Sequence, residues 1–306
     1  MKKRLLLLYI LMFQWVVIAQ NNTKYTTFRH ALQETHQVTW LDLDCAEVSL
    51  INTQIHKLPN LQSLYITNCE LSVLPKAIKE VRNLSLLNIQ GNTIADLPEY
   101  LNQLENITVL NLRNNAFKKL PEVITALPKL REVDISYNPQ LDIKSVITTC
   151  IKVKKLDFLY LDGNNLIQIP SDINKLHALE EIHLSENPQL KLSSAFKNLA
   201  QVPNLKIVVL SNNDITQIPQ ELSLMQQING LVLDNNPAIN ITELLVNTAH
   251  LEHLKVLLLR ENNLSKLPTD LKGFKRLEVL ELSGNHFPKA EQERIKSQLP
   301  TTNLVF

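Results

Sequence analysis

The sequence contains little glycine and few aromatic residues. Only five of its 306 residues are glycine, and none of them falls in a G-x-G-x-x-G or G-x-x-x-x-G-K-[ST] pattern. Loops that wrap phosphate groups depend on such glycines, so we expect neither a nucleotide site nor a bound cofactor. Aromatic residues make up 5% of a chain that is 44% hydrophobic. Its apolar content is therefore mostly leucine, isoleucine and valine.

Cysteine and net charge are scarce as well. Cys45, Cys69 and Cys150 are the only cysteines. They are too few, and odd in number, for a disulfide framework, so we expect packing alone to stabilise the fold. The formal net charge of +1 gives no reason to expect nucleic acid as a partner.

The amino terminus differs from the rest of the chain. Lys2, Lys3 and Arg4 precede an apolar stretch from Leu5 to Ile18. This layout predicts a signal peptide at residues 1–19, cleaved after Ala19, and hence export to the periplasm, cell surface or exterior. The alternative is a retained anchor, but the stretch is shorter than the ~20 residues that span a bilayer. Without the three leading cations, 28 basic residues face 30 acidic ones.

A pattern of leucines, L-x-x-L-x-L-x-x-N-x-L, repeats along the remaining chain. An incomplete first copy holds Leu41, Leu43 and Ala46, and the ninth position then recurs every 23 or 26 residues. That position is Cys69, Asn92, Asn115, Asn138, Asn164, Asn187, Asn213, Asn236, Asn262 and Asn285. Ten to eleven copies at a near-fixed period are a specific signature of a repeat protein. We interpret Cys69 as a weak hydrogen-bond donor in place of asparagine.

The segments between the leucine patterns come in two lengths. Six begin with Leu-Pro or Ile-Pro, at Pro75, Pro98, Pro121, Pro170, Pro219 and Pro268. Proline suits the first position of a short helix, so we expect one there. Three others carry Asn-Pro, at Pro139, Pro188 and Pro237, and are three residues longer. Their composition, as at residues 241–246, predicts fuller amphipathic helices.

These residues resemble the leucine-rich-repeat family, in its bacterial exported type with 23-residue L-P-x-x-I units alternating with 26-residue N-P units. The resemblance implies an α/β solenoid, a curved horseshoe with about eleven parallel strands on its concave side and short helices and turns on its convex side. It implies an amino-terminal cap at 20–37, an array at 38–287 and a carboxy-terminal cap at 288–306. We expect both caps to be helical, from Thr26 to His36 and from Pro288 to Leu299.

Because side chains alternate along a strand, the residues that face outward can be listed. We expect the concave face to bind the ligand. The candidate residues are Tyr65, Asn111, Arg113, Asp134, Tyr137, Tyr160, His183, Glu186, Val209, Val232 and Leu258. The last three are apolar, and we weigh a docking patch against ordinary packing between neighbouring strands.

The predicted face is acidic. Its outward positions hold thirteen Asp or Glu and five Lys or Arg. This charge disfavours nucleic acid and favours a basic or mixed protein surface; a peptide or a glycan also fits.

Catalysis finds little support in the sequence. His177, Glu181 and His183 lie close together, but strand alternation separates His177 from the other two, so we expect no metal site. Asp134, Ser136 and His183 share the face, yet nothing implies an oxyanion hole. We therefore expect no enzyme but a protein-binding module, as a monomer or with weak self-association. The alternative is a structural, self-associating scaffold of the cell envelope.

Overall fold

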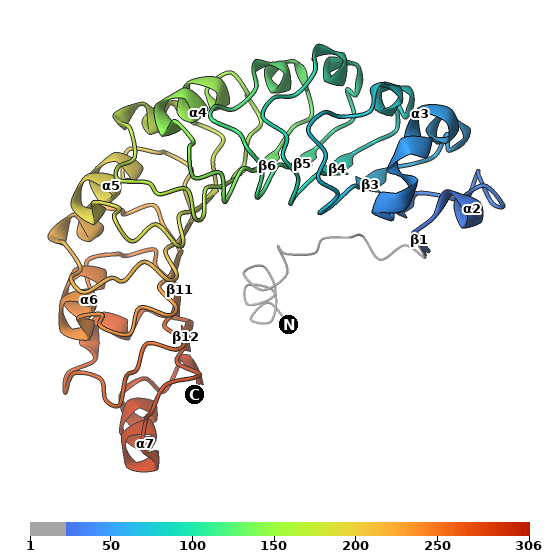
Figure 1. Cartoon of the computed structure of the whole chain (residues 1–306). Coiled ribbons are helices and arrows are strands. Elements are labelled where there is room, and N and C mark those ends of the chain that lie inside the picture. Colours follow the sequence, from blue (N-terminus) through green and yellow to red (C-terminus); the bar gives the residue numbers. More distant parts are fainter. Residues whose placement is uncertain (1–22) are drawn as a thin grey trace.

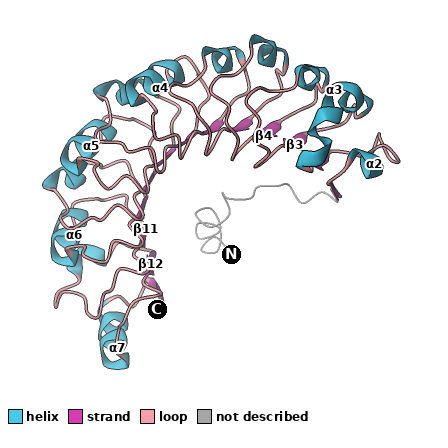
Figure 2. Ribbon diagram, in the orientation of Figure 1, coloured by secondary structure: helices cyan, strands magenta, loops and turns pink. Residues whose placement is uncertain are grey.

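The computed structural model describes residues 23–306, so the predicted signal peptide lies outside the described part of the chain. The described residues form an open arc, with strands lining its inner side and helices its outer side (Figure 1). Figure 2 shows that loops make up much of the arc between its short strands and helices. The predicted solenoid is confirmed.

One parallel sheet of 13 strands, in sequence order, runs through the described residues. The strands are β1 (Lys24–Tyr25), β2 (Trp40–Asp42), β3 (Ser63–Tyr65), β4 (Leu86–Asn88), β5 (Val109–Asn111), β6 (Glu132–Asp134), β7 (Phe158–Tyr160), β8 (Glu181–His183), β9 (Ile207–Val209), β10 (Gly230–Val232), β11 (Val256–Leu258), β12 (Val279–Glu281) and β13 (Asn303–Val305). The eleven predicted strands are β2 to β12. The two further strands, β1 and β13, come from segments that we predicted to be helical caps.

Helices return the chain along the convex side. The α-helices are α2 (Phe28–Ala31), α3 (Ile51–Gln54), α4 (Ile143–Cys150), α5 (Leu192–Leu199), α6 (Ile241–Thr248) and α7 (Lys289–Gln298). The 3₁₀-helices are η1 (Cys45–Leu50), η2 (Ile55–Lys57), η3 (Lys76–Glu80), η4 (Glu99–Gln103), η5 (Glu122–Ala126), η6 (Ser171–Lys175), η7 (Gln220–Leu224) and η8 (Lys272–Phe274).

Repeat length decides the kind of helix. The three Asn-Pro repeats form α4, α5 and α6, each of eight residues, as predicted. Five of the Leu-Pro and Ile-Pro repeats form five-residue 3₁₀-helices, and there the proline lies one residue before the helix rather than at its predicted first position. Three additional residues therefore convert one tight turn into two turns of α-helix.

The amino-terminal helix is shorter than predicted. Instead of residues 26–36, α2 covers only Phe28–Ala31, and Thr27 caps it by accepting from the His30 N–H. Phe28 and Ala31 are buried, whereas most of residues 33–37 are exposed. The segment therefore offers apolar side chains for only one helical turn. At the other end, α7 begins after Pro288 and buries Ile295.

The core is a stack of aliphatic side chains. The middle residue of each strand from β2 to β12 points inward and is fully buried, for example Leu64, Leu110 and Ile182. Each such side chain contributes about 2 kcal/mol of hydrophobic stabilisation. Register is exact from strand to strand, as in the pairing of Leu110 with Val133. Outward residues therefore form straight columns across the concave face.

The recurring asparagine at the ninth position of the repeats joins neighbouring repeats. The Asn187 Nδ2 donates to the carbonyls of Leu161, Leu184 and Ser185, at 2.9 to 3.1 Å. Its Oδ1 accepts from the N–H groups of Asn164 and Leu166. One buried amide thus satisfies backbone groups of two repeats. The same pattern recurs from Asn92 to Asn285.

The prediction that packing alone stabilises the fold is wrong at one place. Cys45 and Cys69 form a disulfide, with their Cα atoms 5.1 Å apart. Their separation of 24 residues is close to one repeat, so stacking brings them side by side. Cys69 therefore acts as a cross-link rather than as a weak donor. Cys150 is free and buried in the core.

Removing one of the ninth-position asparagines, which together form an asparagine ladder along the array, should destabilise the whole array. We expect Asn187→Ala to lower the free energy of unfolding by about 3 kcal/mol, because it leaves several buried backbone groups unpaired. Denaturant unfolding followed by circular dichroism measures the change. Gln168→Ala, at an exposed position, is the control. A loss of unfolding free energy equal to that of the control would contradict this role of Asn187 in joining the repeats.

Candidate functional site on the concave face

Two columns of outward-facing polar residues run across the concave face, one through Asn111 and Asp134 and the other through Ser136 and Asp162. Some of these side chains accept hydrogen bonds from backbone N–H groups. Asn111 and Asp134 accept from the N–H groups of Arg113 and Ser136, at 3.0 and 2.9 Å. Further along, Ser136 accepts from the Asp162 N–H, and Asp162 accepts from the Ser185 N–H. Several side chains of these two columns are therefore polar because backbone N–H groups of the sheet need acceptors there. Polarity alone does not mark a binding residue here.

Four carboxylates gather on β6 to β8 and define what we call the acidic zone: Glu132, Asp134, Asp162 and Glu181. Glu132 pairs in register with Phe158, which in turn pairs with Glu181, so the two glutamates lie two strands apart. Burial and the neighbouring carboxylates of Asp134 and Glu181 raise the pKa of Glu132 to about 7. Burial also raises the pKa values of Asp134 and Asp162. The zone is electrostatically strained when its carboxylates are ionised.

Several charged residues of neighbouring repeats lie in ion pairs. Arg131 and Lys206 form ion pairs with Asp157 and Glu180, and Arg260 forms a bidentate pair with Asp234. At the acidic zone, His183 and Glu181 are within hydrogen-bonding distance, with their Nε2 and Oε1 atoms 2.6 Å apart. Acidic side chains are crowded on β6 to β8, and others, such as Glu281 on β12, lie elsewhere on the face.

Tyr160 and His183 form a ring pair beside the acidic zone. Their centroids are 4.2 Å apart, with an interplanar angle of 36°. Both side chains are partly exposed, and burial raises the pKa of the Tyr160 hydroxyl. A flat polarisable surface next to uncompensated carboxylates suits a cationic group of a ligand.

Arg113, Tyr137 and Glu186 form a bridge along the rim of the face. The Arg113 guanidinium lies 4.0 Å from the centre of the Tyr137 ring, and the Tyr137 hydroxyl donates to Glu186. Burial and this hydrogen bond raise the pKa of Tyr137 to about 12. The ring crosses Gly163, where an added Cβ would lie only 2.8 Å from Tyr137. Gly163 therefore makes room for the bridge.

The rim residues adopt a left-handed backbone. Tyr137 and Glu186 have φ of 54° and 56°, at the eighth position of their repeats. Asparagine or glycine occupies this position in most other repeats, for example Asn114 and Gly163. Tyrosine in this conformation costs on the order of 1 kcal/mol, which its stacking and hydrogen bond offset.

The predicted site residues divide into three groups. Asn111, Arg113, Asp134, Tyr137, Tyr160, His183 and Glu186 lie together on β5 to β8 and the rim. Tyr65 lies apart on β3, where its ring centre is 5.9 Å from that of Trp40. Val209, Val232 and Leu258 form an aliphatic cluster with Val256 and Val279.

The aliphatic cluster offers little surface for docking. Val232 and Leu258 are each only 5% exposed, because neighbouring side chains on the sheet cover them. The packing alternative that the sequence left open describes these residues better. Their assignment to a ligand site stays a prediction, but the structure gives no exposed apolar patch at these positions.

Sequence reasoning missed Glu132 and Glu181 as site residues. They occupy the outward position two residues before Asp134 and His183, and the same alternation places them on this face. The candidate list drew on the positions held by Asp134, Arg113 and Tyr137 in their repeats and left this earlier outward position out. The signal was present in the sequence.

A catalytic arrangement does not form from the residues considered. His183 contacts Glu181, whereas the Ser136 hydroxyl accepts from the Asp162 backbone. Within residues 23–306, no cluster of three or more potential ligands is arranged to hold a metal ion. No helix in that range is both long and apolar enough to cross a membrane.

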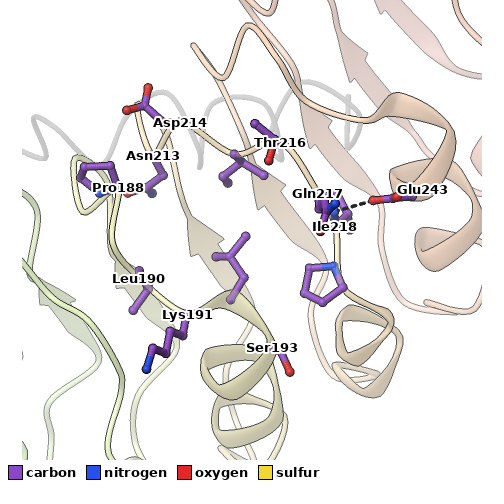
Figure 3. A pocket seen from close by; sticks show the side chains of 13 residues that line it. Pro188, Leu190, Lys191, Ser193, Asn213, Asp214, Thr216, Gln217, Ile218 and Glu243 are labelled. Atoms are coloured by element: carbon purple, nitrogen blue, oxygen red, sulfur yellow. Dashed lines mark hydrogen bonds between the residues drawn. The ribbon is translucent and has the colours of Figure 1, made fainter.

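A groove of about 640 Å³ lies elsewhere, on the flank of three successive repeats. Figure 3 shows Pro188 and Lys191 on one side and Thr216 and Glu243 on the other. Glu243 accepts from the Ile218 N–H at 2.9 Å, so its carboxylate serves the backbone. None of the predicted site residues lines this groove.

Comparison with known proteins agrees with the repeat pattern and the arc. Models of the leucine-rich repeat match residues 82–139 and 60–80. The chain is a leucine-rich-repeat protein. No curated protein sequence matches it.

Several solved structures are similar to this leucine-rich-repeat protein. The complex of TLR13 with the RNA ssRNA13 has a TM-score of 0.60 at 19% identity, covering 90% of this chain and 41% of that one. An internalin of Listeria monocytogenes has a TM-score of 0.52 at 18% identity, covering 91% and 86%. A leucine-rich-repeat protein of Leptospira interrogans has a TM-score of 0.39 at 23% identity, covering 93% and 100%. At these identities the first two similarities show the fold alone.

The raised pKa of Glu132 has a consequence for stability. A carboxyl whose pKa is about 7 when folded, against an ordinary 4.5, stabilises the folded state below pH 4.5 and loses this contribution as the pH rises through 7. We therefore expect Glu132→Gln to leave stability unchanged near pH 4.5 and to raise it by about 2 kcal/mol at pH 8.

Thermal unfolding between pH 4.5 and 8 measures this difference. Glu105→Gln, at an exposed turn, is the control and should show no such trend. A constant difference between Glu132→Gln and wild type at all pH values would show that Glu132 carries no strained charge.

Proposed function

We propose that this protein is a non-catalytic module that binds a basic segment of another protein on its concave face. The observation that carries the proposal is the acidic zone. Glu132, Asp134, Asp162 and Glu181 crowd together there, and burial and the neighbouring carboxylates raise the pKa of Glu132 to about 7. Such crowding lowers stability, and a cost of this kind is typical of surfaces kept for binding.

The negative charge of the acidic zone also favours one class of ligand over another. A lysine or arginine entering the acidic zone would relieve the repulsion between the carboxylates and gain a cation–π contact with Tyr160. Nucleic acid would meet the same carboxylates with its phosphates, which disfavours it. The RNA in the complex of the similar TLR13 is therefore no guide to the ligand of this protein.

The solenoid suits this task because its binding residues sit on short, hydrogen-bonded strands. Register fixes Asp134, Tyr160 and His183 in one column across β6, β7 and β8. Little side-chain and backbone freedom remains to be lost on binding, which favours affinity.

We also propose that the protein is exported. The predicted signal peptide is the main support. The Cys45–Cys69 disulfide adds to it, since disulfides persist in oxidising compartments. The alternative of a self-associating scaffold rested on the aliphatic cluster, which is buried on the sheet.

Neutralising the acidic zone should weaken binding of basic peptides. We expect Glu132→Gln combined with Glu181→Gln to lower affinity at least about tenfold at pH 8 and to flatten its salt dependence. Affinity of the wild type should rise from pH 6 to pH 8, because Glu132 loses its proton in this range.

A pool of peptides of varied charge, captured on the immobilised protein and identified by mass spectrometry, tests both expectations. Glu105→Gln combined with Glu252→Gln removes the same charge from exposed turns and serves as the matched control. Enrichment of basic peptides that is equal for all three proteins, or enrichment of acidic ones, would remove the acidic zone as the binding site.

A further inference from the structure

The contact between the first two repeats, which we call the first joint, differs from the contacts between later repeats. From Asn92 onward, each ninth-position asparagine donates to a carbonyl of the preceding repeat, as Asn92 does to Ile66 at 2.7 Å. Cys69 holds this position in the second repeat and cannot make an amide bridge. The disulfide to Cys45 lies at the same place. A covalent bond therefore stands where the amide stands elsewhere.

The same two strands carry an aromatic pair on the concave face. Trp40 of β2 and Tyr65 of β3 lie 5.9 Å apart, at 46°. Lys24 of β1 bonds Asp42 at 2.9 Å and lies 5.8 Å from the Trp40 ring. The Trp40 indole nitrogen is buried and has no hydrogen-bond partner among residues 23–306. Cys45 and Cys69 come shortly after the carboxyl ends of β2 and β3, so the disulfide joins the segments that follow these two strands.

The disulfide is open to reagents. Cys45 is exposed and Cys69 is partly exposed, whereas the third cysteine, Cys150, is fully buried. Reduction by a dithiol would transfer two electrons and two protons to the sulfur pair, giving two thiols and oxidising the dithiol to its own disulfide.

We propose that the Cys45–Cys69 disulfide is a redox-sensitive clamp: it replaces the asparagine bridge of the first joint, and its reduction releases the amino-terminal end of the concave face. Only the first joint depends on it. The asparagine ladder from Asn92 onward continues to hold the other repeats, so release is local. The clamp does not depend on which ligand the acidic zone binds.

Hydrogen exchange and tryptophan fluorescence test the clamp on the full chain. Trp15 and Trp40 are the only tryptophans, so Trp15→Phe leaves Trp40 as the sole reporter. On reduction we expect amide protection within residues 38–69 to fall by at least about tenfold, with no change from Ile89 onward. The Trp40 emission should shift to longer wavelength as water reaches the indole.

Three variants complete the test. Cys45→Ser with Cys69→Ser should behave like reduced wild type in either redox state. Cys45→Ala with Cys69→Asn restores the asparagine of the later joints and should behave like oxidised wild type, without responding to reductant. Cys150→Ala should respond to reductant as wild type does.

Four results would overturn the proposal. They are free Cys45 and Cys69 thiols in chain purified under oxidising conditions, no change on reduction, loss of protection along the entire array, or no rescue by the asparagine variant. The last would show that the disulfide does not stand in for an asparagine bridge.

Discussion

The structure depends on one repeated joint, in which a buried asparagine amide satisfies backbone groups of two adjacent repeats. Parallel strands only three residues long cannot pair all the polar groups of the turns that follow them. Asn187 supplies donors and an acceptor to those groups, and its equivalents do so along the array. With the joint fixed, leucines stack beneath the sheet and outward residues align in columns. The concave face is a consequence of that alignment.

The columns serve two purposes, and the structure separates them. Asn111, Ser136 and Asp162 accept hydrogen bonds from backbone N–H groups, so the sheet itself explains their polarity. Among residues 23–306, no hydrogen bond joins the Glu132 carboxylate to the backbone, and burial with the neighbouring carboxylates raises its pKa to about 7. Glu181 contacts His183 instead. This crowding of carboxylates is the support for the proposed ligand of opposite charge.

Much of this could be predicted from the sequence, because period and alternation are local properties. Repeat boundaries, the asparagine ladder, the longer helices of the Asn-Pro repeats and most of the concave columns follow from spacing alone. The disulfide did not follow, since a count of cysteines ignores that Cys45 and Cys69 lie about one period apart. The burial of Val232 and Leu258 was equally out of reach, because it depends on the neighbours that cover them. The rim bridge from Tyr137 to Glu186 spans 49 residues and needs the empty space above Gly163.

The most direct test of the central claim is to map where a captured basic peptide protects the protein. Hydrogen exchange of the complex, compared with the free chain, reports protection strand by strand. The account predicts new protection across β6 to β8 and along the rim from Tyr137 to Glu186, with the convex helices unchanged. Protection confined to the flank groove between Pro188 and Glu243, or to the convex side, would contradict it.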